Sequence, residues 1–164
     1  MNNKQITSQE IALLILRITI GMLLVWWGLA KVVNPGMGVM VSKKFYFDMF
    51  SIKTLQYYFG YVQIVVGACV ASGFLRRFAV PAQLMITGIS SLAIWQALLD
   101  PFGLYLPVAK VAGIQHLFYP SAIILAASAT LIVFRSMDRL ALDNLFFAKR
   151  DEEAEDYTAP VAAE

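Results

Sequence analysis

Residues 11–33 read IALLILRITIGMLLVWWGLAKVV, an apolar stretch whose only charged residues are Arg17 and Lys31. A helix needs about 20 apolar residues to cross a hydrocarbon layer of about 30 Å. Three more stretches have a similar character, at residues 55–75, 78–99 and 116–134. Because backbone groups in lipid must find hydrogen-bond partners within the protein, we predict an all-α integral membrane protein with four helices packed as a bundle.

The composition agrees with this prediction. Of the 164 residues, 59% are hydrophobic and 15% are charged, whereas an ordinary soluble domain has about 25% charged residues. The net charge is only +2, and no basic stretch is interleaved with aromatic residues. We therefore exclude nucleic acid as a partner. Cys69 is the only cysteine, which rules out an internal disulfide, and we expect it to pack in the bundle.

The chain after the fourth stretch divides into two parts. Residues 137–148 combine apolar and charged side chains, a pattern typical of a short helix at a membrane interface. Residues 150–164 are acidic, which predicts a disordered tail. We therefore expect a single domain over residues 1–149, followed by this tail.

The basic residues predict the orientation of the bundle. With four spans, both termini lie on one side of the membrane. That side carries Lys4, Arg76, Arg77, Arg135, Arg139, Lys149 and Arg150, and the opposite side carries Lys31, Lys43, Lys44, Lys53 and Lys110. Short basic loops tend to stay in the cytoplasm, so we expect cytoplasmic N- and C-termini.

Arg17 lies about two turns inside the first stretch, where an unpaired arginine costs roughly 2.5–3.5 kcal/mol. Our preferred partner for it is Asp143, on the same side after the fourth stretch, and Asp138 is the second choice. A bidentate pair would tie the first helix to the end of the chain and give Arg17 a structural role. The alternative is an Arg17 side chain that extends to the interface.

Small and polar residues follow one face of the first two stretches at helical spacing. They are Arg17, Gly21, Leu24, Gly28 and Lys31 on the first, and Gln56, Gly60, Gln63, Gly67 and Ala71 on the second. Small residues let helices approach closely, and amides form hydrogen bonds between helices. We expect both faces to point into the bundle, with helix packing as their simplest role.

Aromatic and polar residues gather in the half of the bundle that lies away from the termini. An aromatic belt at the interface explains most of them. The alternative is a pocket in which aromatic side chains stack on a flat ring while polar groups bind its substituents, as for a quinone or a lipid. The candidate residues are Lys31, Gln63, Gln96, His116, Trp26, Trp27 and Trp95.

His116 is the only histidine of the chain. A haem held by two histidines and a zinc site of His and Cys are therefore excluded within this chain. We assign no metal ligands, catalytic residues or intrinsic cofactor, because no Ser-His-Asp set, phosphate loop or carboxylate cluster is present. His116 is either an interface residue or a proton carrier for quinol oxidation.

Several short motifs occur in a characteristic order. They are Leu16-Arg17, Gly21 and Gly28-Leu29-Ala30-Lys31, then Gln63, Gly67 and Gly73-Phe74-Leu75-Arg76-Arg77, and finally Asp138-Arg139-Leu140-Ala141-Leu142-Asp143. Over about residues 10–145 the chain thereby resembles the DoxX family of small four-helix bacterial membrane proteins. The resemblance implies the same fold and an association with quinone-linked or sulfur and redox complexes. Gln63 stands where the family often has glutamate, and an amide cannot accept a proton as that carboxylate would.

We expect a multi-pass protein of the bacterial inner membrane that acts as a non-catalytic subunit or anchor of a respiratory or redox complex. Its partners would be membrane lipids and a larger membrane complex or a second copy of itself. One alternative is a quinone-reactive small subunit of a quinone-linked oxidoreductase, ranked second because the chain supplies no redox centre. Another is a carrier of a small lipid or metabolite, which needs a water-accessible cavity.

Overall fold

The computed structural model describes residues 6–46, 48, 50–93, 95, 99–100, 105 and 115–144. Within these residues the chain is helical and has no strand, so the all-α prediction is confirmed. The helices are α1 (Ser8–Val33), α2 (Pro35–Phe45), α3 (Lys53–Ser72), α4 (Arg76–Ala93) and α6 (Gln115–Val133).

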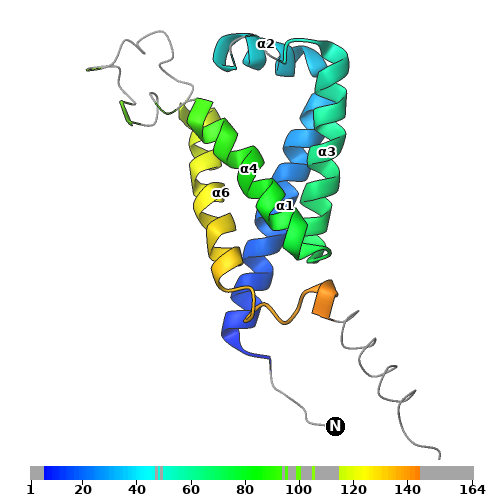
Figure 1. Cartoon of the computed structure of the whole chain (residues 1–164), viewed down its shortest axis with the longest axis vertical. Coiled ribbons are helices and arrows are strands. Elements are labelled where there is room, and N and C mark those ends of the chain that lie inside the picture. Colours follow the sequence, from blue (N-terminus) through cyan, green and yellow to red (C-terminus); the bar gives the residue numbers. More distant parts are fainter. Residues whose placement is uncertain are drawn as a thin grey trace, which may run out of the picture.

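The long helices α1, α3, α4 and α6 lie alongside one another, and the short α2 crosses one end of them (Figure 1). α1 packs most extensively on α3, while α4 packs on both α3 and α6. A smaller contact between α1 and α6 completes the arrangement. We call the end covered by α2 the α2 end. The opposite end, where α1 begins and α6 finishes, is called the terminal end.

Local signals define where α1 and α3 begin and end. Thr7 and Glu10 form a capping box at the start of α1, in which the Thr7 hydroxyl accepts from the Glu10 amide and the Glu10 carboxylate accepts from the Thr7 amide. Pro35, which cannot continue α1, occupies the first turn of α2. Gly73 closes α3 with a left-handed φ of 75°, a conformation that costs glycine little.

The α1–α3 seam is a contact of backbone on backbone. A Cβ atom on Gly67 would lie 2.6 Å from the Gly21 carbonyl oxygen, and one on Gly28 would lie 2.5 Å from the Gly60 carbonyl oxygen. Each helix contributes two glycines seven residues apart, which is about two helical turns. The glycines of both predicted stripes therefore meet at this seam, where no larger residue fits.

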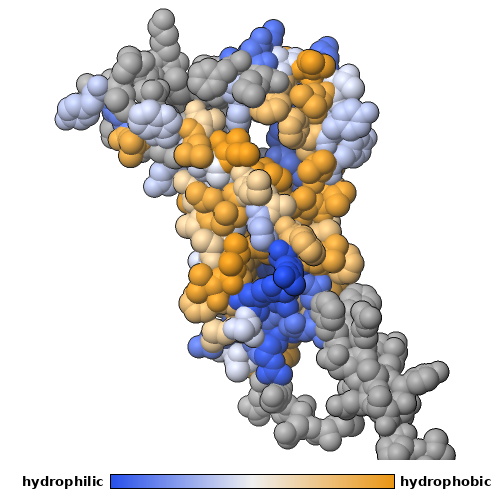
Figure 2. Space-filling view, in the orientation of Figure 1, coloured by the Kyte–Doolittle hydropathy of each residue, from blue (hydrophilic) through white to orange (hydrophobic). Residues whose placement is uncertain are grey.

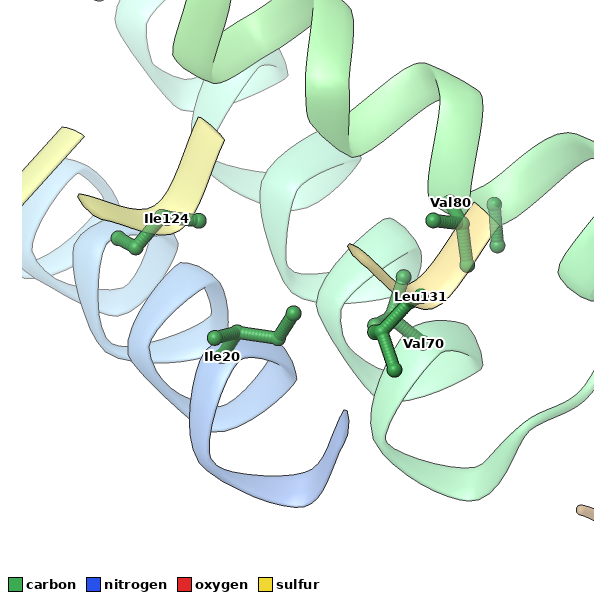
Figure 3. Close-up of a cluster of buried hydrophobic side chains, with 6 residues drawn as sticks. Ile20, Val70, Val80, Ile124 and Leu131 are labelled. Carbon is green, nitrogen blue, oxygen red and sulfur yellow. The ribbon is translucent and has the colours of Figure 1, made fainter. Parts of the chain in front are cut away.

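The apolar core lies in the terminal half of the bundle. Figure 3 shows its buried side chains, which come from all four long helices: Ile20, Val70, Ala79, Val80, Ile124 and Leu131. The α4–α6 contact is more polar. There Gln83 donates to the Ser128 hydroxyl at 3.3 Å, while Thr87 and Ser91 are buried and donate to carbonyls of their own helix.

Apolar side chains also cover the outside of the bundle. Figure 2 shows a hydrophobic middle region between more hydrophilic ends. Within the described part, two helices, Ser8–Val33 and Lys53–Ser72, are long and apolar enough to cross a membrane by length and composition. Much of their apolar surface faces outward, as at Trp26 (70% exposed) and Val65 (62% exposed).

The segment after α6 differs from the prediction. Residues 137–141 form turns in place of the start of the expected helix over 137–148, and helix begins only at Leu142. In a continuous helix, Asp138 and Asp143 would point about 140° apart, because each residue rotates the helix by about 100°. The turns instead bring both carboxylates into the terminal end. Residues 145–148 and the expected acidic tail at 150–164 lie outside the described residues.

Replacing Gly67 with alanine should destabilise the bundle by about 1–3 kcal/mol, the usual cost of overpacking a tight contact. The added methyl group would also lie 2.8 Å from the Val25 amide nitrogen, so the helix backbones must separate. The measurement is thermal or denaturant unfolding of the purified protein, followed by circular dichroism.

Gly88→Ala is the matched control, because its methyl group would meet only Leu125 Cδ1, at 3.5 Å. It should leave stability within about 1 kcal/mol of the wild type, or raise it through better helix propensity. Equal losses in the two variants would contradict a backbone contact at the α1–α3 seam.

Candidate functional site

Arg17 is the centre of a buried polar site at the terminal end. Its side chain is 2% exposed. Nη1 donates to both carboxylate oxygens of Asp138, at 2.9 and 2.7 Å. Nε donates to the Ala71 carbonyl at 3.3 Å, and Nη2 donates to the Leu140 carbonyl at 3.2 Å. One side chain of α1 thus holds the end of α3 and the segment after α6.

The preferred pairing of Arg17 with Asp143 was wrong, and the second choice, Asp138, is the partner in the structure. The Asp143 carboxylate instead accepts from the backbone amides of Leu75 and Arg76, at 2.8 and 2.9 Å. Amides in the first turn of a helix have no partner within that helix and carry partial positive charge. The start of α4 therefore binds Asp143 and leaves Asp138 for Arg17.

Arg76 is a second buried arginine at this site, with 7% of its surface exposed. Its Nη1 donates to the Asp138 carbonyl at 2.8 Å and to Asp138 Oδ2 at 3.2 Å. Its Nη2 donates to Asn144 Oδ1 at 2.7 Å, and its Nε lies 3.6 Å from Asp143 Oδ2. The sequence predicts Arg76 in a basic loop, and its burial was not predicted. The signal available in the sequence was the presence of two aspartates, Asp138 and Asp143, which could bind a second arginine besides Arg17.

We call Arg17, Arg76, Asp138 and Asp143 the arginine–aspartate cluster. Its two positive and two negative charges balance, and most of its polar atoms have protein partners. Glu10 and Arg139 add an ion pair at 3.3 Å on the rim, where the half-exposed Arg139 contributes little. The described residues contain no group of three or more His, Cys, Asp or Glu that could hold a metal ion. This arrangement is suited to holding helices together.

Lys31 and Gln63 form a second polar site, nearer the α2 end. Lys31 Nζ donates to Gln63 Oε1 at 2.8 Å across the α1–α3 seam. Gln63 is 8% exposed, and Lys31 is partly buried. Among the described residues, no carboxylate lies within ion-pair distance of Lys31. Within this part of the chain, the ammonium therefore has a neutral hydrogen-bond acceptor and no counter-ion.

The other candidates for a ring-binding pocket do not gather around Lys31 in the described structure. Trp26 is 70% exposed and Trp95 is 49% exposed, while Trp27 packs against the apolar core. Gln96 lies outside the described residues, and so does the side chain of His116, whose backbone belongs to α6. Among the described candidates, a hydrogen bond joins Lys31 and Gln63.

α2 is attached to the bundle by side chains that the sequence analysis did not single out for this role. Gln56 of α3 donates to the Ser42 hydroxyl at 2.9 Å and to the Phe50 carbonyl at 2.6 Å. The Tyr46 hydroxyl donates to Ser90 of α4 at 3.1 Å. Burial raises the pKa of Tyr46, which keeps this hydroxyl protonated as a donor.

Comparison of the chain with protein-family models, with curated proteins and with solved structures finds no match. The resemblance to the DoxX family remains a prediction from short motifs. Function must therefore be inferred from the bundle and its two polar sites.

A double-mutant cycle tests the pairing of Arg17 with Asp138. Asp138→Asn should destabilise the bundle by about 3–5 kcal/mol, because it leaves the buried Arg17 without a carboxylate. Arg17→Met should cost less, because Asp138 keeps its longer contact with Arg76. The double variant should lose less than the sum, by about 0.5–3 kcal/mol. The measurement is the free energy of unfolding from denaturant titrations.

Asp143→Asn is the control variant for this cycle, because the hydrogen bonds of the Asp143 carboxylate go to the amides of Leu75 and Arg76 and not to Arg17. Its coupling energy with Arg17→Met should be smaller than that of Asp138→Asn. Additive losses for the Asp138 pair, together with strong coupling for Asp143, would overturn the observed pairing.

Proposed function

We propose that this chain is a multi-pass protein of the bacterial inner membrane, with four spanning helices and both termini in the cytoplasm. The observation that carries this proposal is the outward apolar surface of α1 and α3. Only 33% of the apolar window in α1 and 28% of that in α3 is buried within the protein. The core helix of a soluble protein would be mostly buried, so the exposed sides call for lipid or a membrane partner.

The polar ends of the bundle support the proposed orientation. Arg76, Arg77, Arg135 and Arg139 all lie at the terminal end, which is the side expected to stay in the cytoplasm. Arg17 reaches its partners at this end, so its charge is neutralised near the proposed interface. α4 is less apolar than α1, and Tyr119–Val133 of α6 is apolar but shorter. In this proposal both helices span the membrane as part of the bundle.

Within that membrane setting, we propose a non-catalytic subunit or anchor of a larger respiratory or redox complex, similar to DoxX proteins. The arginine–aspartate cluster supports a structural role, because its groups are occupied in holding α1, α3, α4 and the segment after α6. Such a rigid end offers a stable surface for a partner. The exposed apolar faces of the helices would contact membrane-embedded subunits.

Labelling with a membrane-impermeant maleimide tests the orientation, in a Cys69→Ser background that removes the single native cysteine. Ser51→Cys, in the connection between α2 and α3, should react in intact cells. Arg77→Cys, at the terminal end, should react only after the cells are permeabilised. The reverse pattern, or equal labelling of both sites in intact cells, would refute the proposed topology.

Purification in a mild detergent, followed by mass spectrometry of co-eluting proteins, tests the anchor role. We expect stoichiometric membrane subunits to elute with the chain. A chain that elutes alone with stoichiometric quinone would favour the second candidate function below.

The Lys31–Gln63 site favours quinone binding as a second candidate function. The Lys31 ammonium has three N–H donors, and Gln63 accepts from one of them. The remaining donors suit the carbonyl oxygens of a quinone ring or the oxygens of a lipid headgroup. Trp27, on the same helix, is the aromatic candidate that is partly buried in the bundle.

Titration of a short-chain quinone against the tryptophan fluorescence of the detergent-solubilised protein tests this candidate. Lys31→Met should weaken binding about tenfold or more, the loss expected for a hydrogen bond from a charged donor. Lys53→Met, which removes an exposed lysine at the same end of the bundle, should bind as the wild type does. Equal affinities in all three proteins would exclude Lys31 from a quinone site.

A further inference from the structure

A hollow of about 490 Å³ opens at the terminal end, beside the arginine–aspartate cluster. It is a broad hollow that is open to the outside and not an enclosed cavity. It is lined by Arg76, Ile132, Val133, Arg135, Ser136 and Asn144. These residues come from the start of α4, the last turn of α6 and the segment that follows it.

The charge in the hollow comes from Arg135. The guanidinium of Arg76, the other cation of the lining, is committed to Asp138, Asp143 and Asn144. Arg135 is exposed, and no ion-pair partner for its side chain occurs among the described residues. Its backbone carbonyl, which accepts from Arg76 at 3.4 Å, is its contact with the cluster. The Arg135 guanidinium and the exposed Ser136 hydroxyl are therefore available to an anion.

The other wall of the hollow is apolar. Ile132 is 43% exposed and Val133 is 72% exposed, both in the last turn of α6. Arg135 thus lies two residues beyond Val133 and three beyond Ile132, in the turns that follow α6. A small soluble anion would satisfy Arg135 but leave this surface uncovered. A ligand with an anionic head and an apolar chain matches both walls.

We propose that the hollow binds an anionic phospholipid. The phosphate lies against the Arg135 guanidinium and the Ser136 hydroxyl, and an acyl chain follows α6 over Ile132 and Val133. Arginine suits this role because its planar donors can bind two phosphate oxygens at once. This proposal rests on the proposed membrane placement, in which the terminal end lies at the cytoplasmic headgroup layer, where anionic lipids attract basic residues.

Native mass spectrometry of the full chain in detergent micelles provides the test, with phosphatidylglycerol and phosphatidylcholine as the added lipids. The wild type should bind phosphatidylglycerol in preference and should unfold at a higher temperature in its presence. Arg135→Gln should reduce the preference about tenfold, as expected for the loss of one charge-assisted contact. Arg135→Lys, which keeps the charge but not the planar donors, should lose less.

Arg77→Gln is the matched control, because it removes the same charge from an exposed arginine at the same end but outside the hollow. It should keep the preference for phosphatidylglycerol. Equal losses in Arg135→Gln and Arg77→Gln would show general attraction to the basic end and would overturn the proposal. Stabilisation by inorganic phosphate that disappears in Arg135→Gln would also overturn it, because the site would then bind a free anion.

The lipid site and the proposed membrane topology can be refuted independently of each other. If maleimide labelling supports the topology while no lipid preference is found, the lipid site is refuted and the membrane bundle stands. If labelling refutes the topology, a preference for phosphatidylglycerol that depends on Arg135 would still establish a lipid site on a differently placed protein.

Discussion

The structure depends on burying the guanidinium of Arg17 at one end of the bundle. A buried arginine is tolerated only when a carboxylate and further acceptors surround it, and here Asp138 and the carbonyls of Ala71 and Leu140 do so. These partners come from two separate segments, α3 and the chain after α6. Satisfying one side chain of α1 therefore fixes the level of α3 against α1 and folds the chain after α6 inward. The glycines at the α1–α3 seam bring the two helices close enough for the contact with Ala71.

The two ends of the bundle have different characters. Apolar side chains and balanced charges fill the terminal half, whereas polar groups line the interior toward the α2 end. Gln83 lies beside Ser128, next to the apolar core; it is wholly buried, and its Oε1 atom has no hydrogen-bond partner among the described residues. Nearer the α2 end, the Lys31 ammonium has no counter-ion among the described residues. In the proposed function, partners bind the terminal end, and the Lys31–Gln63 site near the α2 end is the candidate for a quinone.

Much of the fold could be predicted from residue patterns, because helix class, glycine faces and the need to neutralise Arg17 all follow from local sequence. The choice between Asp138 and Asp143 could not, because it depends on competition from the free amides at the start of α4. These amides can compete with Arg17 for a carboxylate only in the folded chain, where the left-handed turn at Gly73 brings the start of α4 beside the segment after α6. The burial of Arg76 was missed for the same reason. The attachment of α2 was also not predicted. Tyr46 bonds to Ser90, which is distant in sequence, and Gln56 bonds to the carbonyl of Phe50, which lies outside the helices.

The contact between Arg17 and Asp138 spans 121 positions of the sequence, and this separation matters during biosynthesis. A ribosome makes the chain from its N-terminus, so Arg17 emerges long before its counter-ion exists. Until the segment after α6 has been made, the first helix carries an uncompensated charge that disfavours its final placement. A nascent chain that ends before Asp138 therefore holds an arginine with no counter-ion, and its bundle cannot close.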